Sequence, residues 1–180
     1  VSIARNNGIK EAKHEFIAFM DADDWWEPTF LSEMKTLIEE YPGAGLYGSN
    51  YYLVKNKRQY PAPSGIDPNF KKGLIDYFGV YAHTNCQPVW TGATVIPKKI
   101  LESVGVFNPE LKLGEDFDLW IRIALKYPVV FLNKYLSNYN QDSDVKNRAT
   151  GHFIEPFHHV LWNLSYLEKE EKKNPLLNKL

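Results

Sequence analysis

The chain has 180 residues, of which 44% are hydrophobic and 24% charged; this is the length of one domain, and the composition excludes an intrinsically disordered protein. The formal net charge is −1, so no overall positive potential indicates a nucleic acid as partner. The single cysteine, Cys86, excludes an internal disulfide and a metal site with several cysteines, and no apolar run reaches the roughly 18 residues of a membrane-spanning helix.

Hydrophobic periodicity and turn residues predict helices and strands in alternation along the chain. The expected helices cover residues 1–13, 28–41, 70–78, 97–104, 115–126 and 152–172. The expected strands cover residues 15–20, 46–54, 89–96 and 129–132, with loops at residues 56–69 and 138–150. The alternation predicts an α/β fold, with the body of the domain in residues 1–150 and a helical tail in residues 151–180.

The first candidate site follows the strand expected near the start of the chain. The apolar run Phe16–Met20 ends in three carboxylates, Asp21, Asp23 and Asp24. Ligands of open α/β sheets bind beyond the carboxyl ends of strands, and Mg²⁺ is usually held by one or two carboxylates together with phosphate oxygens. Asp21 and Asp23 therefore predict a divalent metal bound to a phosphorylated substrate. A polar turn with a helix cap is the simpler alternative, since Asp is common in both.

A second acidic group opens the helix expected at residues 115–126. The helix dipole favours acidic residues in the first turn by roughly 0.3–1 kcal/mol each, which accounts for Asp118 but not for the adjacent pair Glu115 and Asp116 after a glycine. Consecutive helix positions point about 100° apart, so the two carboxylates have different jobs. We expect one to face a substrate hydroxyl, where a carboxylate serves as general base, and the other to brace the loop.

Three further signals are weaker. Gly92, two residues after Trp90, either permits close approach of a ligand to the backbone or is an ordinary strand glycine. Arg5 is either a solvated residue on a helix face or a donor to a phosphate or a base. Trp25 and Trp26 either pack in the core or border a pocket.

Taken together, these residues resemble the GT-A, family 2 inverting glycosyltransferases. The resemblance covers about residues 1–140 and runs in order through residues 2–9, 19–24, 91–93 and 114–122. It implies a GT-A fold, which is a Rossmann-like, doubly wound mixed sheet. Because the family opens with a strand and turn that bind the nucleobase, the resemblance also implies a fragment that lacks the first βαβ units of the nucleotide-binding half.

The resemblance assigns a role to each candidate residue. It places Asp21 toward the ribose of the donor and makes Asp23 the ligand of Mg²⁺ or Mn²⁺. It makes Asp116 the catalytic base, with Glu115 near the acceptor. By the same resemblance Arg5 lies near the nucleotide. It places Gly92 and Trp90 near the transferred sugar and the acceptor.

The activity implied is transfer of a sugar, with inversion, from a nucleotide-sugar donor to a carbohydrate or lipid-linked acceptor. The resemblance also implies a role in polysaccharide biosynthesis in the cytoplasm, and it allows peripheral attachment to the cytoplasmic face of a membrane. We expect turnover from the full-length protein and little or none from this fragment alone.

Other classes of protein also place acidic residues after an apolar strand. A HAD-like phosphatase expects Thr or Val two positions after the second Asp, where Trp25 stands. A calcium-binding EF-hand loop expects Gly at its sixth position, where Trp26 stands. A non-catalytic or degenerate carbohydrate-binding protein that uses Trp25, Trp26 and Trp90 stays open. No motif in the sequence indicates which donor sugar, acceptor or linkage the protein uses.

Overall fold

The computed structural model describes residues 1–142 and 154–174 of the chain. Its helices are α1 (Ser2–Glu11), α2 (Phe30–Glu40), α3 (Tyr77–Thr84), α4 (Lys98–Val104), α5 (Glu115–Ala124) and α6 (Glu168–Glu171). Its strands are β1 (Phe16–Ala18), β2 (Trp25–Trp26), β3 (Leu46–Lys55), β4 (Arg58–Pro61), β5 (Lys72–Ile75), β6 (Thr94–Pro97) and β7 (Val129–Asn140). Short 3-10 turns cover Thr91–Ala93, Pro156–His158, Val160–Trp162 and Leu164–Leu167.

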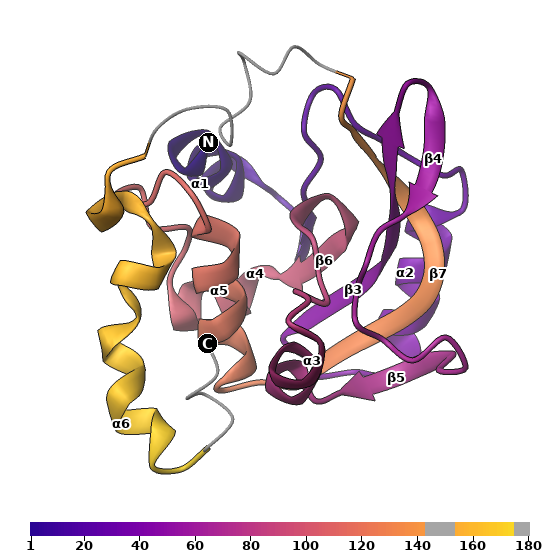
Figure 1. Cartoon of the computed structure of the whole chain (residues 1–180). Helices are drawn as coiled ribbons and strands as arrows, with labels where there is room; N and C mark the ends of the chain where they lie inside the picture. Colours follow the sequence, from indigo (N-terminus) through magenta and orange to yellow (C-terminus); the bar gives the residue numbers. More distant parts are fainter. Residues whose placement is uncertain (143–153, 175–180) are drawn as a thin grey trace.

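A seven-stranded mixed sheet forms the centre of the molecule (Figure 1), with the order β1-β6-β3-β7-β2, β4 paired with β3 and β5 paired with β7. Strands β3 and β7 pair in parallel, and the other pairs among the described strands are antiparallel. Alternate residues of a strand point to opposite faces. Accordingly, Leu46 and Val129 belong to one hydrophobic cluster, while Tyr47 and Val130 belong to another. The sheet is therefore buried on both faces.

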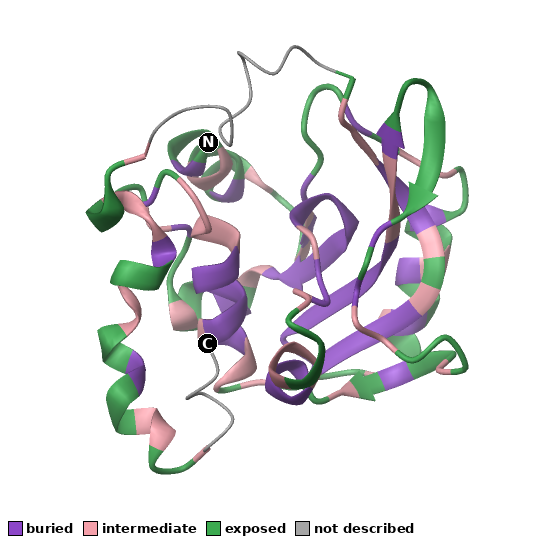
Figure 2. Ribbon diagram, viewed as in Figure 1, coloured by how far each residue is buried: buried purple, intermediate pink, exposed green. Residues whose placement is uncertain are grey.

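Helices on both sides of the sheet supply the apolar side chains that bury it. Helix α2 covers one face through Phe30, Met34 and Leu37, which are spaced three or four residues apart and at most 1% exposed. Helices α1, α4 and α5 lie on the other side (Figure 1). Figure 2 shows that buried residues concentrate in the central strands and in α5. This arrangement confirms the predicted α/β class.

Most of the predicted elements are confirmed. The helices expected at residues 1–13, 28–41, 97–104 and 115–126 are α1, α2, α4 and α5, and the strands expected at residues 15–20 and 46–54 are β1 and β3. The strand expected at residues 89–96 begins only at Thr94, after a 3-10 turn. Strand β7 continues through Asn140, so the loop expected from residue 138 begins later, and its residues 143–150 lie outside the described residues.

The loop predicted at residues 56–69 is wrong at its start. Arg58–Pro61 form β4, which pairs with Tyr52–Lys55 of β3 in a hairpin. The two residues of its turn, Asn56 and Lys57, have φ angles of 51° and 59°. Two positive φ angles are typical of the hairpin turn that matches the twist of the flanking strands, and asparagine favours this conformation. The asparagine was the available signal for this hairpin.

The helix predicted at residues 70–78 is also wrong. Lys72–Ile75 form β5, which pairs with Val129–Leu132 of β7. The helix α3 begins only at Tyr77, and its cap is Asp76, whose side chain accepts a hydrogen bond from the backbone N–H of Gly79 at 2.9 Å. Hydrogen bonding to the neighbouring strand therefore outweighs the local helical pattern in this segment.

The single helix predicted at residues 152–172 is replaced by 3-10 turns and the short helix α6 in residues 154–174; residues 152 and 153 lie outside the described range. The backbone N–H of Lys112 donates to the carbonyl of His158 at 2.9 Å, and that of Val160 donates to the carbonyl of Leu113 at 3.1 Å. These bonds require an extended backbone near His159, which interrupts a helix. Within the described ranges, no helix has the length and apolar character needed to cross a membrane.

Candidate active site

The acidic turn after β1 is bonded to the sheet through its third carboxylate. Asp21 and Asp23 are exposed, whereas Asp24 is only 8% exposed. One oxygen of Asp24 accepts a hydrogen bond from the backbone N–H of Asn140, at the end of β7, at 2.8 Å. Burial, supported by the charges of Asp23 and Asp21, raises the pKa of Asp24 to about 7 against the opposing effect of that N–H. Asp24 therefore fixes the turn, while Asp21 and Asp23 remain exposed.

Arg5 of α1 lies between the two acidic groups that the sequence singles out. Its guanidinium donates to Asp21 Oδ1 at 3.1 Å and to Glu115 Oε1 at 2.9 Å. The Arg5 side chain is 12% exposed, and its guanidinium lies 5.3 Å from the centre of the Phe107 ring. The acidic turn after β1 and the start of α5 are therefore neighbours in space.

Asp116 is held at the start of α5 by two donors. The backbone N–H of Phe117 donates to Oδ1 at 2.7 Å, and the hydroxyl of Thr91 donates to Oδ2 at 3.1 Å. Burial raises the pKa of Asp116, and these donors and Arg5 partly oppose the shift. A raised pKa makes the carboxylate a better proton acceptor.

Glu115 and Asp116 have different partners, as the helix geometry requires. Glu115 faces Arg5, and Asp116 faces Thr91. The pKa of Glu115 is also raised, first by burial and then by the charge of Asp116. Glu115 thus binds the loop to α1, and Asp116 has oxygen lone pairs left for a ligand.

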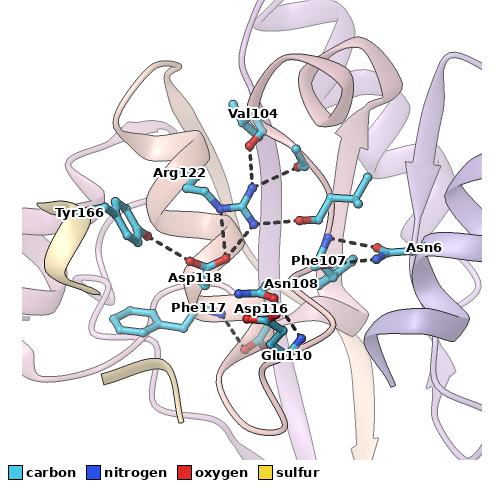
Figure 3. Close-up of polar contacts among 12 residues, drawn as sticks. Asn6, Val104, Phe107, Asn108, Glu110, Asp116, Phe117, Asp118, Arg122 and Tyr166 are labelled. Atoms are coloured by element: carbon cyan, nitrogen blue, oxygen red, sulfur yellow. Dashed lines mark hydrogen bonds and ion pairs between the residues drawn. The ribbon is translucent and has the colours of Figure 1, made fainter. Parts of the chain in front are cut away.

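Asp118 has a structural role, which Figure 3 shows in detail. It accepts two hydrogen bonds from Arg122, at 3.0 and 2.7 Å, and one from the hydroxyl of Tyr166 at 3.1 Å. Nearby, Asn6 of α1 exchanges two hydrogen bonds with the backbone of Phe107, at 2.8 and 3.1 Å (Figure 3). These bonds fix the segment that leads into α5 against α1 and the tail.

The turn at residues 90–93 lies beside Asp116 through Thr91. The ring of Trp90 stacks on Tyr51, with ring centres 4.6 Å apart. A Cβ at Gly92 would lie 2.4 Å from the Trp90 ring, so the glycine leaves room for this indole. This space requirement accounts for Gly92 without a ligand. The carbonyl of Gly92 accepts a hydrogen bond from the indole of Trp26 at 2.8 Å, which favours the core interpretation of Trp26.

Two hollows each include one of the predicted site carboxylates in their lining. The larger, of about 620 Å³, runs along α1 and β1 and includes Arg5 and Asp21 in its lining. The smaller, of about 300 Å³, includes Asp116, Gln87 and His159. No sequence pattern assigns Gln87 or His159 to a site. Thr91 lies within residues 91–93 of the resemblance, and only the fold reveals its contact with Asp116.

Asp21 and Asp23 are the residues that fit a divalent metal. Nowhere in residues 1–142 and 154–174 do three or more His, Cys, Asp or Glu side chains gather in a way that holds a metal ion. The two carboxylates are nevertheless of the oxygen type that Mg²⁺ and Mn²⁺ prefer, and Mg²⁺ commonly takes its other ligands from water and phosphate oxygens. This donor set therefore fits a metal that arrives together with a phosphorylated substrate.

Comparison with known proteins decides the family. The model of the family described as "Glycosyl transferase family 2" matches residues 1–104. The chain belongs to glycosyl transferase family 2. This membership favours the transferase interpretation over the HAD-like phosphatase. The motif at residues 114–122 lies beyond the matched segment, so the fold has to place it.

Solved structures share the fold of this family 2 chain. The S. aureus protein TarS, in complex with UDP-GlcNAc, superposes with a TM-score of 0.69 at 18% sequence identity, over 87% of this chain and 42% of that chain. The match confirms the predicted GT-A fold.

Proteins with similar sequences are named glycosyltransferases. A protein of Rickettsia felis called an uncharacterized glycosyltransferase is 25% identical over 93% of this chain and 28% of the relative. The Escherichia coli UDP-Glc:alpha-D-GlcNAc-diphosphoundecaprenol beta-1,3-glucosyltransferase WfaP is 31% identical over 68% of this chain and 44% of the relative. The Erwinia amylovora amylovoran biosynthesis glycosyltransferase AmsB is 26% identical over 84% of this chain and 50% of the relative. The family 2 chain thus spans half or less of each of these three proteins.

Proposed function

We propose that the full-length protein transfers a sugar, with inversion, from a nucleoside diphosphate donor to a hydroxyl of a carbohydrate or lipid-linked acceptor. The observation that carries the proposal is the Arg5 bridge, which brings Asp21 and Glu115, and with Glu115 its neighbour Asp116, into one site. Family membership supports the reaction class. The names of TarS with UDP-GlcNAc and of WfaP with an undecaprenol-linked substrate support the donor and acceptor classes.

In this proposal Asp116 acts as the general base. It takes the proton of the acceptor hydroxyl, and that oxygen attacks the anomeric carbon from the face opposite the diphosphate. The bond between the anomeric carbon and the diphosphate oxygen breaks in the same step, so the configuration inverts. Thr91 and the N–H of Phe117 hold the carboxylate in place, and its raised pKa suits proton transfer.

The donor lies on the side of Asp21 and Asp23. Asp23 is the proposed ligand of Mg²⁺ or Mn²⁺, and Asp21, held by Arg5, faces the ribose. The bound metal supplies positive charge near the leaving diphosphate. The guanidinium of Arg5, bonded to both Asp21 and Glu115, holds the donor side of the site against the start of α5. Trp90 and Gly92 are proposed to border the transferred sugar.

The setting of the reaction belongs to the same proposal. The substrate in the name of WfaP is joined to undecaprenol diphosphate, which favours work at the cytoplasmic face of a membrane and a role in polysaccharide biosynthesis. Because the chain spans half or less of these relatives, turnover is proposed for the full-length protein and not for these 180 residues alone.

The test separates turnover from binding in the full-length protein. Asp116→Asn keeps the shape of the side chain and removes the base, so we expect loss of sugar transfer by about 100-fold or more. Affinity for UDP with Mn²⁺, measured by calorimetry, is expected to stay unchanged. Glu102→Gln, at an exposed position of α4, is the matched control and should keep both properties.

Two results would contradict the proposal in different ways. Turnover retained by Asp116→Asn would assign the base to another residue. Sugar binding without turnover of any nucleotide sugar by the wild-type protein would favour the carbohydrate-binding alternative.

A further inference from the structure

Most of the lining of the small pocket at Asp116 lies beyond the segment that the family match reaches. Tyr81 and Gln87 lie within that segment, and the tail contributes His159, Val160 and Leu161. The matched segment ends at residue 104. We propose that this pocket binds a sugar unit of the acceptor, and that Gln87 and His159 position it by hydrogen bonds. The proposal rests on the function proposed above.

Gln87 carries a donor that the protein itself does not use. Its amide Nε2 is buried and has no hydrogen-bond partner among the residues that the structure describes. A buried donor without a partner costs about 1–3 kcal/mol, so such a group in a pocket wall indicates a ligand that accepts its hydrogen bond. A sugar hydroxyl or ring oxygen is such an acceptor.

His159 has its hydrogen-bonding direction set by its own backbone. Its Nδ1 accepts a hydrogen bond from the N–H of Leu161 at 3.2 Å. In the neutral ring the proton is then on Nε2, which becomes a donor. His159 therefore offers a second donor to the same pocket.

The tail is held firmly enough to serve as a wall. His159 forms a parallel bridge with Leu113, next to the start of α5. Gly114 then packs on Val160 so closely that a Cβ at Gly114 would lie 2.3 Å from a methyl group of Val160. Gly114 also has a φ of +78°, which favours glycine. His159 is distant from Asp116 in the sequence, but the bridge and this contact hold it beside the start of the helix that carries Asp116.

The chemistry of the pocket suits a neutral polyhydroxy ring. The donors of Gln87 and His159 and the carboxylate of Asp116 can form hydrogen bonds with sugar hydroxyl groups. The apolar side chains of Leu113, Val160 and Leu161 can pack against the C–H face of a sugar. A diphosphate would be repelled by Asp116. The volume of about 300 Å³ is at the lower end of small-molecule sites, which favours one sugar unit over a whole nucleotide sugar.

The test measures glycoside binding and nucleotide binding separately in the full-length protein. The probes are the methyl glycosides of glucose, galactose and N-acetylglucosamine, observed by saturation-transfer NMR, and UDP with Mn²⁺, observed by calorimetry. We expect at least one glycoside to bind the wild type. Gln87→Leu and His159→Phe should weaken that binding about three- to tenfold, which is the loss of one hydrogen bond.

Two further variants distinguish positioning from packing. His159→Gln places an amide donor near the position of Nε2 and should restore glycoside binding, whereas His158→Phe, one residue earlier and outside the pocket lining, should change nothing. UDP affinity should be unchanged in all four variants, and each variant should stay folded at the temperature of the binding measurements.

The inference is overturned if no glycoside binds the wild type, if Gln87→Leu and His159→Phe leave glycoside binding intact, or if they weaken UDP binding equally. Failure of the proposed function has a different signature, which is the absence of UDP binding in the wild type itself.

Discussion

Arg5 bonds to two carboxylates at once, Asp21 at 3.1 Å and Glu115 at 2.9 Å. Glu115 is 14% exposed, so loss of the guanidinium leaves a largely buried charge without its partner. We expect Arg5→Met to lower the free energy of unfolding by about 3 kcal/mol, measured by urea denaturation.

Two companion variants test that explanation. Arg58→Met removes an exposed arginine of β4 and should have almost no effect. Adding Glu115→Gln to Arg5→Met should recover part of the loss, because a neutral amide is cheaper to bury than a carboxylate. Equal losses in Arg5→Met and Arg58→Met would show that the bridge contributes little.

Asp24 makes stability depend on pH. Burial raises the pKa of Asp24 from its ordinary value of 3.8 to about 7 in the folded chain. Between these two pH values the folded state holds a proton that the unfolded state releases. Stability is therefore lost as pH rises from about 4 to about 7. Asp24→Asn removes this loss, and we expect the variant to gain stability at pH 8, by at most about 4 kcal/mol, and little at pH 4.

The measurement for Asp24 is the melting temperature in EDTA from pH 4 to pH 8. EDTA is needed because a metal at Asp23 would alter the neighbouring charge. Asp23→Asn, at an exposed position, is the control and should follow the wild-type profile more closely. A gain in Asp24→Asn that is the same at pH 4 and pH 8 would rule out titration of Asp24 as its cause.

At the scale of elements, one arginine positions the helix that carries the proposed base. Arg122 of α5 donates to the carbonyl oxygens of Val104 at 2.7 Å, Gly105 at 3.2 Å and Val106 at 2.9 Å (Figure 3). It joins α5 to the end of α4 while Asp118 neutralises it. The first turn of α5 is thereby held against the site.

We expect Arg122→Met to lower the free energy of unfolding by about 3 kcal/mol, because Asp118 and the three carbonyls lose their donor. Tyr166→Phe removes one hydrogen bond to Asp118 and should cost about 1 kcal/mol. Lys126→Met, exposed just after α5, is the control in the same denaturation experiment. An equal effect of Arg122→Met and Lys126→Met would contradict this role.

Periodicity predicted those elements whose burial follows one helix face or one apolar run. Helices α2 and α5 and strand β3 are of this kind. It failed where a distant partner decides the backbone. Lys72–Ile75 became a strand because β7 lies beside it, and the tail was interrupted because His158 and Val160 bond to Lys112 and Leu113. Such partners are not encoded within one segment.

The sequence also predicts only those parts of the candidate site that lie within one segment. The acidic residues after β1 and at the start of α5 are recognisable by type and spacing. That Arg5 bonds to both groups is visible only in the fold. Gln87 and Thr91 come from the connection between α3 and β6, His159 comes from the tail, and the three share no sequence pattern. Only the fold shows that they lie around Asp116.

At the scale of the molecule, the sheet explains why these segments meet. Strands β1 and β6 are antiparallel, with Ala18 opposite Val95, so the last residues of β1 lie beside the first residues of β6. The acidic turn after β1 and the turn at Thr91–Ala93 are therefore neighbours. The last residue of β7, Asn140, also lies there and bonds to Asp24. Ligands of open α/β sheets bind beyond the carboxyl ends of strands.

A crystal structure of the full-length protein with Mn²⁺ and a UDP-sugar tests the central claim most directly. The anomalous signal of manganese is predicted beside Asp23, with the anomeric carbon of the sugar between the metal and the carboxylate of Asp116. A manganese site away from Asp23, or a sugar bound with Asp116 on the far side of the molecule, would contradict the account.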